Sequence, residues 1–351
     1  MSAPADARDD SLGSIAWNRG RFDVQALGGM IGPVEAILDD HRIVRPFAVA
    51  PWSDDPAAEW EATAPPLLKR LRGDWVCLPF GSPGRPRIDL DPRWLDGLDV
   101  DLASPDPAQH GTCANARWRL DAAEPRALSF SFSPDAGFPI ARIERRIAVT
   151  DGRSALTFET RVRARAKCEL PWGVHPTFRL PPQPGSFDIA FGAERPRVFT
   201  FPGVFEKGVS QIAPARACDG LENVPTIHGA ARSFASLPLP FDTEELLLVA
   251  DHKGTARLTN RAERYRIVMD WDASVFPSVL VWISNRGRKY APWNGRFLGL
   301  GIEPVVSAFD LGHAHAINPH SPLRALGIPT ATHFSPARDV ATTYEIRFET
   351  I

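Results

Sequence analysis

Proline is the residue that most constrains how this chain can fold. It supplies 34 of the 351 residues, about 10%, where the average is roughly 5%. A proline inside a helix removes a hydrogen bond and costs about 3 kcal/mol, so prolines spread along the whole chain leave little room for long helices. Hydrophobic residues make up 44% of the sequence, which is enough for a large core and argues against a disordered proline-rich chain. These values favour a large β protein with many turns.

Alternation of apolar and polar residues indicates where the strands lie. In the run 154–166, the apolar side chains share one parity, and Arg161, Arg163 and Arg165 lie on the other. This period of two predicts a half-buried strand with an outward arginine face. The preceding run, 143–149, ends at Asp151-Gly152, which is a hairpin turn signal. The same alternation recurs at 128–132, 265–271 and 344–348. One-faced strands of this kind favour antiparallel sheet.

The rest of the pattern indicates one all-β domain. The best helical pattern, 65–72, covers about two turns. Strand and helix patterns do not alternate along the chain, which argues against a doubly wound or (β/α)₈ architecture. The proline-rich runs 181–185 and 236–240 are read as loops because strand signals resume soon after each. We therefore expect a disordered N-terminal stretch, residues 1–15, followed by one large antiparallel β-sandwich over residues 16–351.

Charge and cysteine content exclude several classes of protein. The chain has 40 basic and 42 acidic residues, a net charge of −2, whereas a nucleic-acid binder needs a basic excess. No apolar run approaches the ~18 residues of a membrane span, and the N-terminus has no signal-peptide pattern. The four cysteines are scattered and form no CxxC pair. We expect reduced thiols and a cytoplasmic location, with no nucleic-acid or membrane partner. The sequence leaves the oligomeric state open.

One single histidine and one histidine pair could carry chemistry. His175 is followed by proline, which favours extended or turn geometry and a ring that projects from a strand end or loop. His313 and His315 form an HxH pair, which in a strand would point both rings to one face, as in metal-binding barrels of the cupin type. No carboxylate follows this pair where the cupin pattern has a glutamate. We therefore expect no metal there, with a metal site as the alternative.

Glu303 is the outlier among the acidic residues. It lies in FLGLGIEPVV, where uncharged residues surround a single carboxylate. Burying an unpaired carboxylate is expensive, so such a residue is usually retained for a function. The alternative is a salt bridge to an arginine elsewhere in the chain. Gly301 and Pro304 indicate a strand end, where the side chain can face a cleft. The ten tryptophans could stack on sugar rings, although core packing explains most of them equally well.

Five motifs in order resemble the aldose 1-epimerase (mutarotase-like) family, including its hexose-6-phosphate epimerase branch. They are RGDWVCLPFG (72–81), HGTCANARW (110–118), GVHPTFRL (173–180), Val281-Trp282 and GIEPVVSAF (301–309). Their order and spacing extend the resemblance over about residues 20–350. The sequence departs from the family pattern at four positions: Ala114 replaces an arginine, Thr177 an aromatic residue, and Val305 and Val306 polar residues.

The resemblance implies a large antiparallel β-sandwich (supersandwich) of the galactose mutarotase-like type. It also implies a reaction that interconverts the anomers of a hexose or hexose phosphate without a cofactor. In that reaction Glu303 would take the proton of the C1 hydroxyl while His175 protonates the ring oxygen, which opens the hemiacetal. A histidine and a carboxylate suit proton transfer near neutral pH. The partner is then a small-molecule sugar or sugar phosphate.

The resemblance further implies a set of substrate-binding residues, which are His110, Arg72, Trp282 and, from a region without a clear motif, Asp242. Glu244 follows Asp242 by two residues and shares that region. Arg72 would contact the sugar or its phosphate, because a guanidinium binds phosphate bidentately. Arg85 and Arg87 follow in a glycine-proline loop, where keeping the loop soluble is the alternative role.

These assignments make a geometric prediction. His110, His175 and Glu303 should converge on one open cleft, with acid and base several ångströms apart because a sugar ring must fit between them. Two other functions remain open. A non-catalytic carbohydrate-binding protein on the same fold would tolerate their separation. A different carbohydrate enzyme, such as a lyase on a related β-sandwich, would need a tyrosine or lysine base, and the chain has only three tyrosines.

Overall fold

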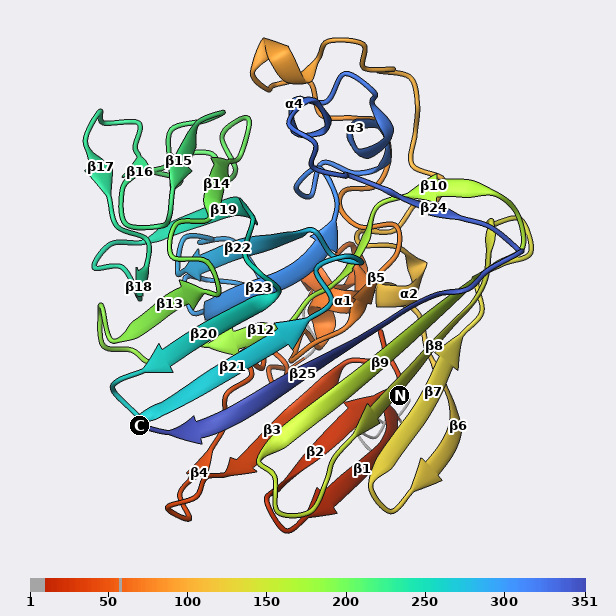
Figure 1. Cartoon of the computed structure of the whole chain (residues 1–351), viewed down its shortest axis with the longest axis vertical. Coiled ribbons are helices and arrows are strands. Elements are labelled where there is room, and N and C mark those ends of the chain that lie inside the picture. Colours follow the sequence, from red (N-terminus) through yellow and green to blue (C-terminus); the bar gives the residue numbers. More distant parts are fainter. Residues whose placement is uncertain (1–9, 57–58) are drawn as a thin grey trace.

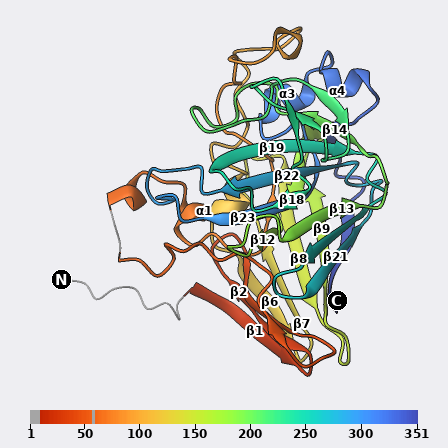
Figure 2. The ribbon, with the colours of Figure 1, turned by 90° about the vertical axis from the view of Figure 1, so that its left-hand side faces the viewer.

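Two large antiparallel sheets face each other and carry most of the backbone (Figures 1 and 2). The structure is a computed structural model and describes residues 10–56 and 59–351. Every strand pair with a defined register is antiparallel, as expected from the one-faced alternation of the sequence. The main apolar core fills the space between the two sheets.

The nine-stranded sheet contains the strands whose alternation was clearest in the sequence, and those predictions are confirmed. Arg161 and Arg163 point outward from β9 while Phe158 and Val162 are buried in the core. In spatial order the strands are β18 (Ser236–Leu237), β13 (Phe187–Phe191), β20 (Thr255–Asn260), β21 (Tyr265–Trp271), β25 (Val340–Thr350), β9 (Ala155–Ala164), β8 (Ile140–Ala148), β7 (Ala127–Phe132) and β6 (Arg119–Glu124).

The eight-stranded sheet is covered on both faces. Its path is β15 (Ala217–Asp219), β14 (Arg197–Thr200), β19 (Thr243–Ala250), β22 (Ser278–Asn285), β23 (Leu298–Val306), β11 (Trp172–Val174) and β5 (Val76–Cys77), and β12 (Thr177–Arg179) also pairs with β23. Every residue of β19 and β22 is buried. One face packs on the nine-stranded sheet. The other lies under a second apolar cluster that includes Trp75, Trp282 and Trp293.

The remaining elements are short and flank the two large sheets. A four-stranded sheet joins β1 (Ser11–Trp17), β2 (Gly20–Gln25), β3 (Ile31–Ile37) and β4 (Ile43–Val44), and two small sheets pair β10 (Cys168–Leu170) with β24 (Thr332–Phe334) and β16 (Val224–Pro225) with β17 (Ala231–Arg232). The helices are η2 (Glu59–Ala62), α1 (Pro66–Lys69), η3 (Pro92–Trp94), α2 (Thr112–Asn115), α3 (His313–Ile317) and α4 (Pro322–Ala325). Among the described residues, no helix has the length and apolarity to cross a bilayer.

The structure corrects the expected N-terminal boundary. Strand β1 begins at Ser11, so residues 11–15 are not part of a disordered stretch, while residues 1–9 lie outside the described residues. Ile15 and Trp17 are buried against the core, and the serines and glycine between apolar positions hide this strand in the sequence. The short helix expected within 65–72 is confirmed as α1.

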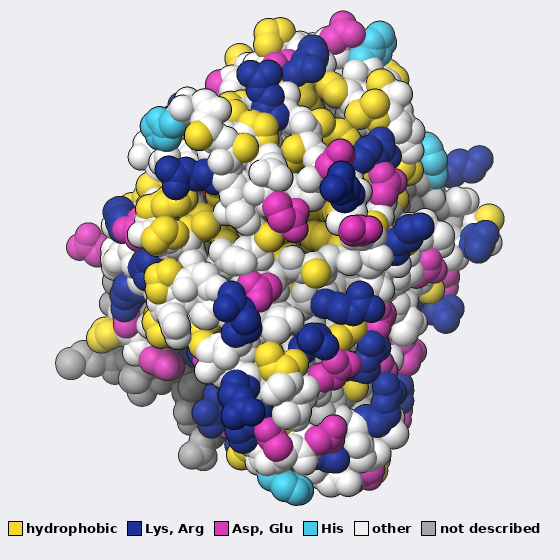
Figure 3. Space-filling view, turned by 60° about the vertical axis from the view of Figure 1, so that its left-hand side comes forward, with side chains coloured by type: hydrophobic (Ala, Val, Ile, Leu, Met, Phe, Trp, Pro, Cys, Tyr) yellow, Lys and Arg dark blue, Asp and Glu magenta, His cyan; other side chains and the backbone are white. Residues whose placement is uncertain are grey.

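The molecular surface mixes charges of both signs. On the face shown in Figure 3, Lys and Arg side chains alternate with Asp and Glu side chains, and no basic patch stands out. Charged side chains also pair between strands of the nine-stranded sheet, as Arg146 of β8 does with Glu159 of β9 and Glu124 of β6. This arrangement accords with the near-balanced net charge of the chain.

Candidate active site

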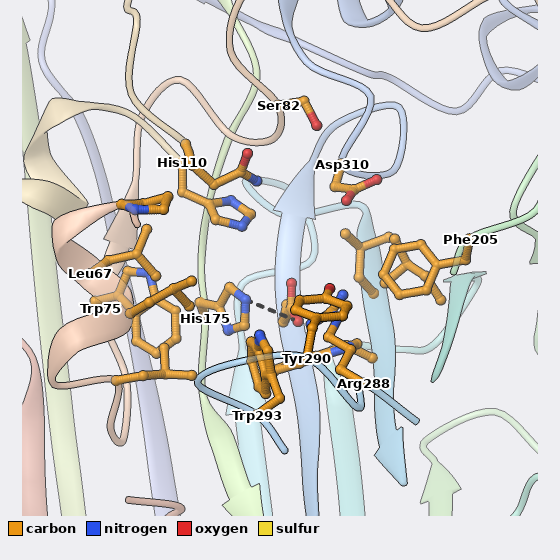
Figure 4. Close-up of a pocket in the computed structure, with 18 residues that line it drawn as sticks. Leu67, Trp75, Ser82, His110, His175, Phe205, Arg288, Tyr290, Trp293 and Asp310 are labelled. Atoms are coloured by element: carbon orange, nitrogen blue, oxygen red, sulfur yellow. Dashed lines mark ion pairs between the residues drawn. The ribbon is translucent and has the colours of Figure 1, made fainter. Parts of the chain in front are cut away.

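An open cavity of about 350 Å³ lies on the face of the eight-stranded sheet that points away from the main core. Figure 4 shows aromatic and titratable side chains meeting there from several loops and strands. The cavity is lined by Pro65, Leu67, Leu68, Leu71, Trp75, Ser82, Gln109, His110, His175, Phe205, Leu246, Leu280, Trp282, Arg288, Tyr290, Trp293, Glu303 and Asp310. The expected convergence of His110, His175 and Glu303 on one cleft is therefore confirmed.

Glu303 enters the cavity from the middle of β23. Strand alternation places Gly301 and Glu303 on the same face, and Leu280 of β22 lies opposite Glu303 in the register. A Cβ atom at Gly301 would collide with Oε1 of Glu303, so the glycine leaves the space that the carboxylate occupies. The side chain is buried, as its apolar surroundings in the sequence predicted, and no arginine of the described chain pairs with it. Burial and the nearby Asp310 raise the pKa of Glu303.

His175 follows β11 and is held on two sides. Its ring stacks on the indole of Trp75, with centroids 4.1 Å apart and planes 18° apart. Its Nδ1 lies 3.2 Å from Oγ1 of Thr177, so the residue that replaces an aromatic of the family pattern contacts the ring directly. Burial lowers the pKa of His175.

His175 and Glu303 touch, which corrects the expectation that acid and base stand several ångströms apart. Nε2 of His175 lies 3.3 Å from Oε1 of Glu303. The distance suits an ion pair, although Oε1 receives no aligned hydrogen bond. Both side chains are buried. Burial lowers the pKa of His175 and raises that of Glu303, and both directions favour the neutral form of each group.

His110 faces His175 across the cavity, with ring centroids 5.4 Å apart at 85°. The backbone N–H of Gly81 donates to Nδ1 of His110 over 3.3 Å. This bond places the ring hydrogen on Nε2, which makes Nε2 a donor. Burial lowers the pKa of His110 to about 4, so the ring is neutral at pH 7. A neutral N–H donor in a cavity suits binding of a hydroxyl or ring oxygen.

Arg288 supplies the only cation among the residues that line the cavity, and the sequence analysis missed it. It lies in the loop after β22. Its Nε donates to Glu206 over 2.9 Å, and its Nη1 lies 3.9 Å from Glu244. Its guanidinium also lies over the ring of Trp293, 4.8 Å from the centroid. Ala114, at the position of the family's arginine, is instead buried in the apolar cluster. The signal available in sequence was only the basic run that follows the Val281-Trp282 motif.

Asp310 is the second residue that sequence reasoning missed. It follows Glu303 by seven residues, beyond the end of β23, and its carboxylate points into the cavity (Figure 4). Burial raises its pKa to about 6, although the charges of Arg288 and Arg87 act in the opposite direction. The signal in the sequence was a lone aspartate shortly after the glutamate motif.

Two expected binding residues do not reach the cavity. Arg72 donates instead to the carbonyl oxygens of Arg70, over 3.1 Å, and of Gly32, over 3.3 Å, and it lines a separate surface pocket. Asp242 precedes β19 and forms ion pairs with Arg286 and Lys289. The expected roles of Arg72 and Asp242 are therefore corrected.

Trp282, by contrast, lines the cavity as expected. Arg85 pairs with Asp101, and Arg87 pairs with Asp89. None of these loop arginines supplies a free guanidinium to the cavity, so the expected phosphate contact has no counterpart among the cavity-lining residues.

A buried polar network lies beneath His175. The backbone N–H of His175 donates to Oδ1 of Asp74 over 3.1 Å. Oδ2 of Asp74 accepts hydrogen bonds from Arg145 and from the hydroxyl of Tyr344. The side chains of Asp74 and Arg145 are fully buried. This network joins the segment that carries Trp75 to the segment that carries His175.

His313 and His315 do not have the strand geometry of a cupin pair. Both lie in α3, where residues two apart point in different directions around the helix. Nε2 of His315 lies 2.8 Å from the carbonyl oxygen of Arg87. Over residues 10–56 and 59–351, no group of three or more His, Cys, Asp or Glu side chains is arranged to hold a metal ion.

Comparison with solved structures identifies the fold. The chain is similar to a galactose mutarotase-like protein from Lactobacillus casei ATCC 334, with a TM-score of 0.59 and 14% identity over 96% of this chain and 99% of that one. It is also similar to the GalM/aldose epimerase homologue from C. elegans, with a TM-score of 0.58 and 13% identity over 96% and 98% of the two chains.

A third similar structure is the galactose mutarotase related enzyme from Lactobacillus acidophilus, with a TM-score of 0.57 and 14% identity over 96% of this chain and 97% of that one. No family model matches the sequence, and no curated protein matches it. At these identities the likeness establishes the fold, and the chain has the galactose mutarotase-like β-sandwich that its motifs resembled.

Proposed function

We propose that this chain is an aldose 1-epimerase that interconverts the α and β anomers of a free sugar in the cavity beside β23. The observation that carries the proposal is the contact between Nε2 of His175 and Oε1 of Glu303, 3.3 Å apart and open to a cavity rich in tryptophan. Anomer exchange needs one acid and one base that act on oxygens bonded to the same carbon. A pair that shares one proton at that spacing supplies both.

The reaction requires no net change in the protonation of the site. Transfer of the shared proton from Glu303 to His175 gives imidazolium and carboxylate. His175 then protonates the ring oxygen while Glu303 accepts the proton of the anomeric hydroxyl, and the C1–O5 bond breaks to give the open-chain aldehyde. Rotation about C1–C2 presents the other face of the carbonyl. Return of both protons during ring closure gives the second anomer and the starting pair.

The surrounding residues suit binding of a sugar ring. Indole rings of Trp75, Trp282 and Trp293 offer flat apolar surfaces, against which the C–H face of a pyranose can stack. His110 offers the Nε2–H donor, because Gly81 occupies Nδ1. These groups come from loops and strands far apart in sequence, and the buried Asp74 network keeps His175 in place during proton transfer.

Polarimetry tests the proposal. Freshly dissolved α anomers of D-glucose, D-galactose and D-mannose should lose optical rotation faster with the protein than in buffer alone. Glu303→Gln and His175→Asn should each lower the catalysed rate by about 10²–10⁴-fold, the usual contribution of a positioned acid or base. Asp242→Asn, which removes a charge outside the cavity, should leave it unchanged.

Binding measurements separate catalysis from sugar binding alone. Sugars that quench the tryptophan fluorescence of the protein without accelerating anomer exchange would indicate a non-catalytic carbohydrate-binding protein. Neither quenching nor exchange with any of the three hexoses would contradict the proposed function.

A further inference from the structure

Asp310 is a cavity carboxylate that the anomer-exchange mechanism does not use. Its side chain points into the same cavity as Glu303 from the loop after β23 (Figure 4). No other described residue donates a hydrogen bond to its carboxylate, and no described cation lies in ion-pair contact with it. Asp310 is partly exposed and lines the cavity. An acceptor left free beside a sugar-sized cavity is therefore available to a ligand.

The backbone around Asp310 is held in a fixed and costly conformation. Phe309, the preceding residue, has a φ of +53°, in the left-handed region that non-glycine residues avoid. The carbonyl oxygen of Asp310 accepts a hydrogen bond from the N–H of Ser82 over 2.7 Å. A Cβ atom at Gly81 would lie 2.7 Å from that same oxygen. Strain of this kind persists where the surroundings over-determine it, often at a ligand site.

The cations nearest to Asp310 are already committed to other acids. Arg288 donates to Glu206 over 2.9 Å and lies 3.9 Å from Glu244. Arg87 pairs with Asp89. The cavity thus carries two carboxylates, Glu303 and Asp310, and one guanidinium whose charge is offset by two further acids. These groups favour binding of a ligand that donates hydroxyl hydrogen bonds, and they disfavour binding of a further anion in the cavity.

We propose that Asp310 is a specificity-determining residue that binds hydroxyls of an unphosphorylated aldose and rejects aldose phosphates. The inference rests on the proposed function for the identity of the ligand as an aldose. Each carboxylate oxygen can accept hydroxyl hydrogens in charge-assisted bonds. A phosphate dianion in the same cavity would meet like charge with no free guanidinium to offset it, which is discrimination by repulsion. Arg72, the expected phosphate contact, lies outside the cavity.

The test compares D-glucose, D-galactose and D-mannose with their 6-phosphates on the wild type and three variants. Asp310→Asn removes the charge with little change of shape, and Asp310→Ser removes it with a smaller side chain, so the conclusion does not depend on one variant. Asp242→Asn is the matched control, because it removes an aspartate that is paired outside the cavity. Binding is followed by tryptophan fluorescence and anomer exchange by polarimetry.

We expect the wild type to bind at least one free hexose about tenfold or more tightly than its 6-phosphate. Both Asp310 variants should weaken binding of that free hexose by about 10- to 100-fold, the equivalent of losing hydrogen bonds to a charged group. The same variants should weaken binding of the 6-phosphate less. The ratio of the two affinities, free hexose over 6-phosphate, should therefore be smaller in the variants than in the wild type. Asp242→Asn should leave the preference as it is.

The outcomes separate this inference from the proposed function. Tighter binding of a 6-phosphate by the wild type, binding of none of the hexoses, or a preference that survives both Asp310 variants would overturn the role of Asp310. Sugar binding that depends on Asp310 without any anomer exchange would support that role and contradict the proposed function. Exchange that proceeds with unaltered KM in the Asp310 variants would leave the proposed function standing and overturn the inference.

Discussion

Replacing Arg145 with methionine tests whether the buried network beneath the site stabilises the fold. Arg145 and Asp74 are fully buried partners, and the substitution leaves the Asp74 carboxylate with only the Tyr344 hydroxyl and the His175 N–H as donors. Removing one partner of a buried ion pair costs about 3–5 kcal/mol, because the remaining charge is desolvated and uncompensated. We therefore expect Arg145→Met to lower the free energy of unfolding by about 3–5 kcal/mol.

The neighbouring Arg146 provides a matched control on the same strand. It points to the opposite face of β8, is 37% exposed, and pairs with Glu124 and Glu159 at the surface. Exposed pairs contribute about 0.2–1 kcal/mol, so Arg146→Met should cost about 1 kcal/mol or less. The two substitutions make the same chemical change, from arginine to methionine. What differs is the burial of the ion pair, which is complete for Arg145 and partial for Arg146.

Urea unfolding followed by circular dichroism measures both variants. With an m-value of about 3 kcal/mol/M, at the upper end for small proteins, Arg145→Met should lower the midpoint by about 1–1.7 M and Arg146→Met by about 0.3 M or less. Adding Asp74→Asn to Arg145→Met should recover part of the loss, because the uncompensated charge is then absent. Equal midpoint shifts for the two arginine variants would refute the reasoning.

Three further predictions follow from the pKa directions and the backbone. Burial lowers the pKa of His252 to about 4, so as the pH falls below ~6.5 the unfolded chain binds a proton before the folded chain does. Between pH 7 and pH 4 the free energy of unfolding of the wild type should therefore fall by about 3 kcal/mol more than that of His252→Gln. Equal pH slopes of the two proteins in urea unfolding would argue against this. Burial lowers the pKa of His175 and raises that of Glu303, so the acid limb of kcat/KM should lie below the ordinary histidine value of ~6.5, and a limb at or above that value would contradict the shared proton. Gly81→Ala should lower the melting temperature more than Gly84→Ala, since both glycines have positive φ but only Gly81 would place a Cβ 2.7 Å from a carbonyl oxygen, whereas Gly84 has open space; similar melting temperatures would show that this close approach does not constrain the fold.

Strand periodicity made most of the fold predictable from sequence. The run 154–166 alternates because one face of β9 lies on the core and the other meets water, so its residue pattern records its surroundings. Strand β1 was not predicted, because Gly13 and Ser14 interrupt the alternation of apolar and polar residues, although Ile15 and Trp17 are buried. Where both faces are buried, as in β22, alternation disappears and only the apolar run remains.

The candidate site was predictable where the strand itself aims the side chain. Glu303 lies within β23, and its apolar neighbours predicted its burial. The expected strand end beside it is wrong, because β23 continues to Val306. Arg72 matched a motif, but its guanidinium turns toward the carbonyl oxygen of Gly32, and sequence does not record that choice of direction. Arg288 and Asp310 come from loops whose directions are set by tertiary contacts, such as the bond from Ser82 to the Asp310 carbonyl oxygen.

The most direct test of the central claim is exchange NMR on an equilibrated anomer mixture. Magnetisation transfer between the α and β C1 protons of a hexose that binds the protein reports ring opening and closure without any other change. The account predicts exchange cross-peaks with the wild type that fall to the level of buffer alone with Glu303→Gln, while the sugar still quenches tryptophan fluorescence. Cross-peaks of equal intensity for the wild type and Glu303→Gln would contradict the assignment of His175 and Glu303 as the proton-transferring pair.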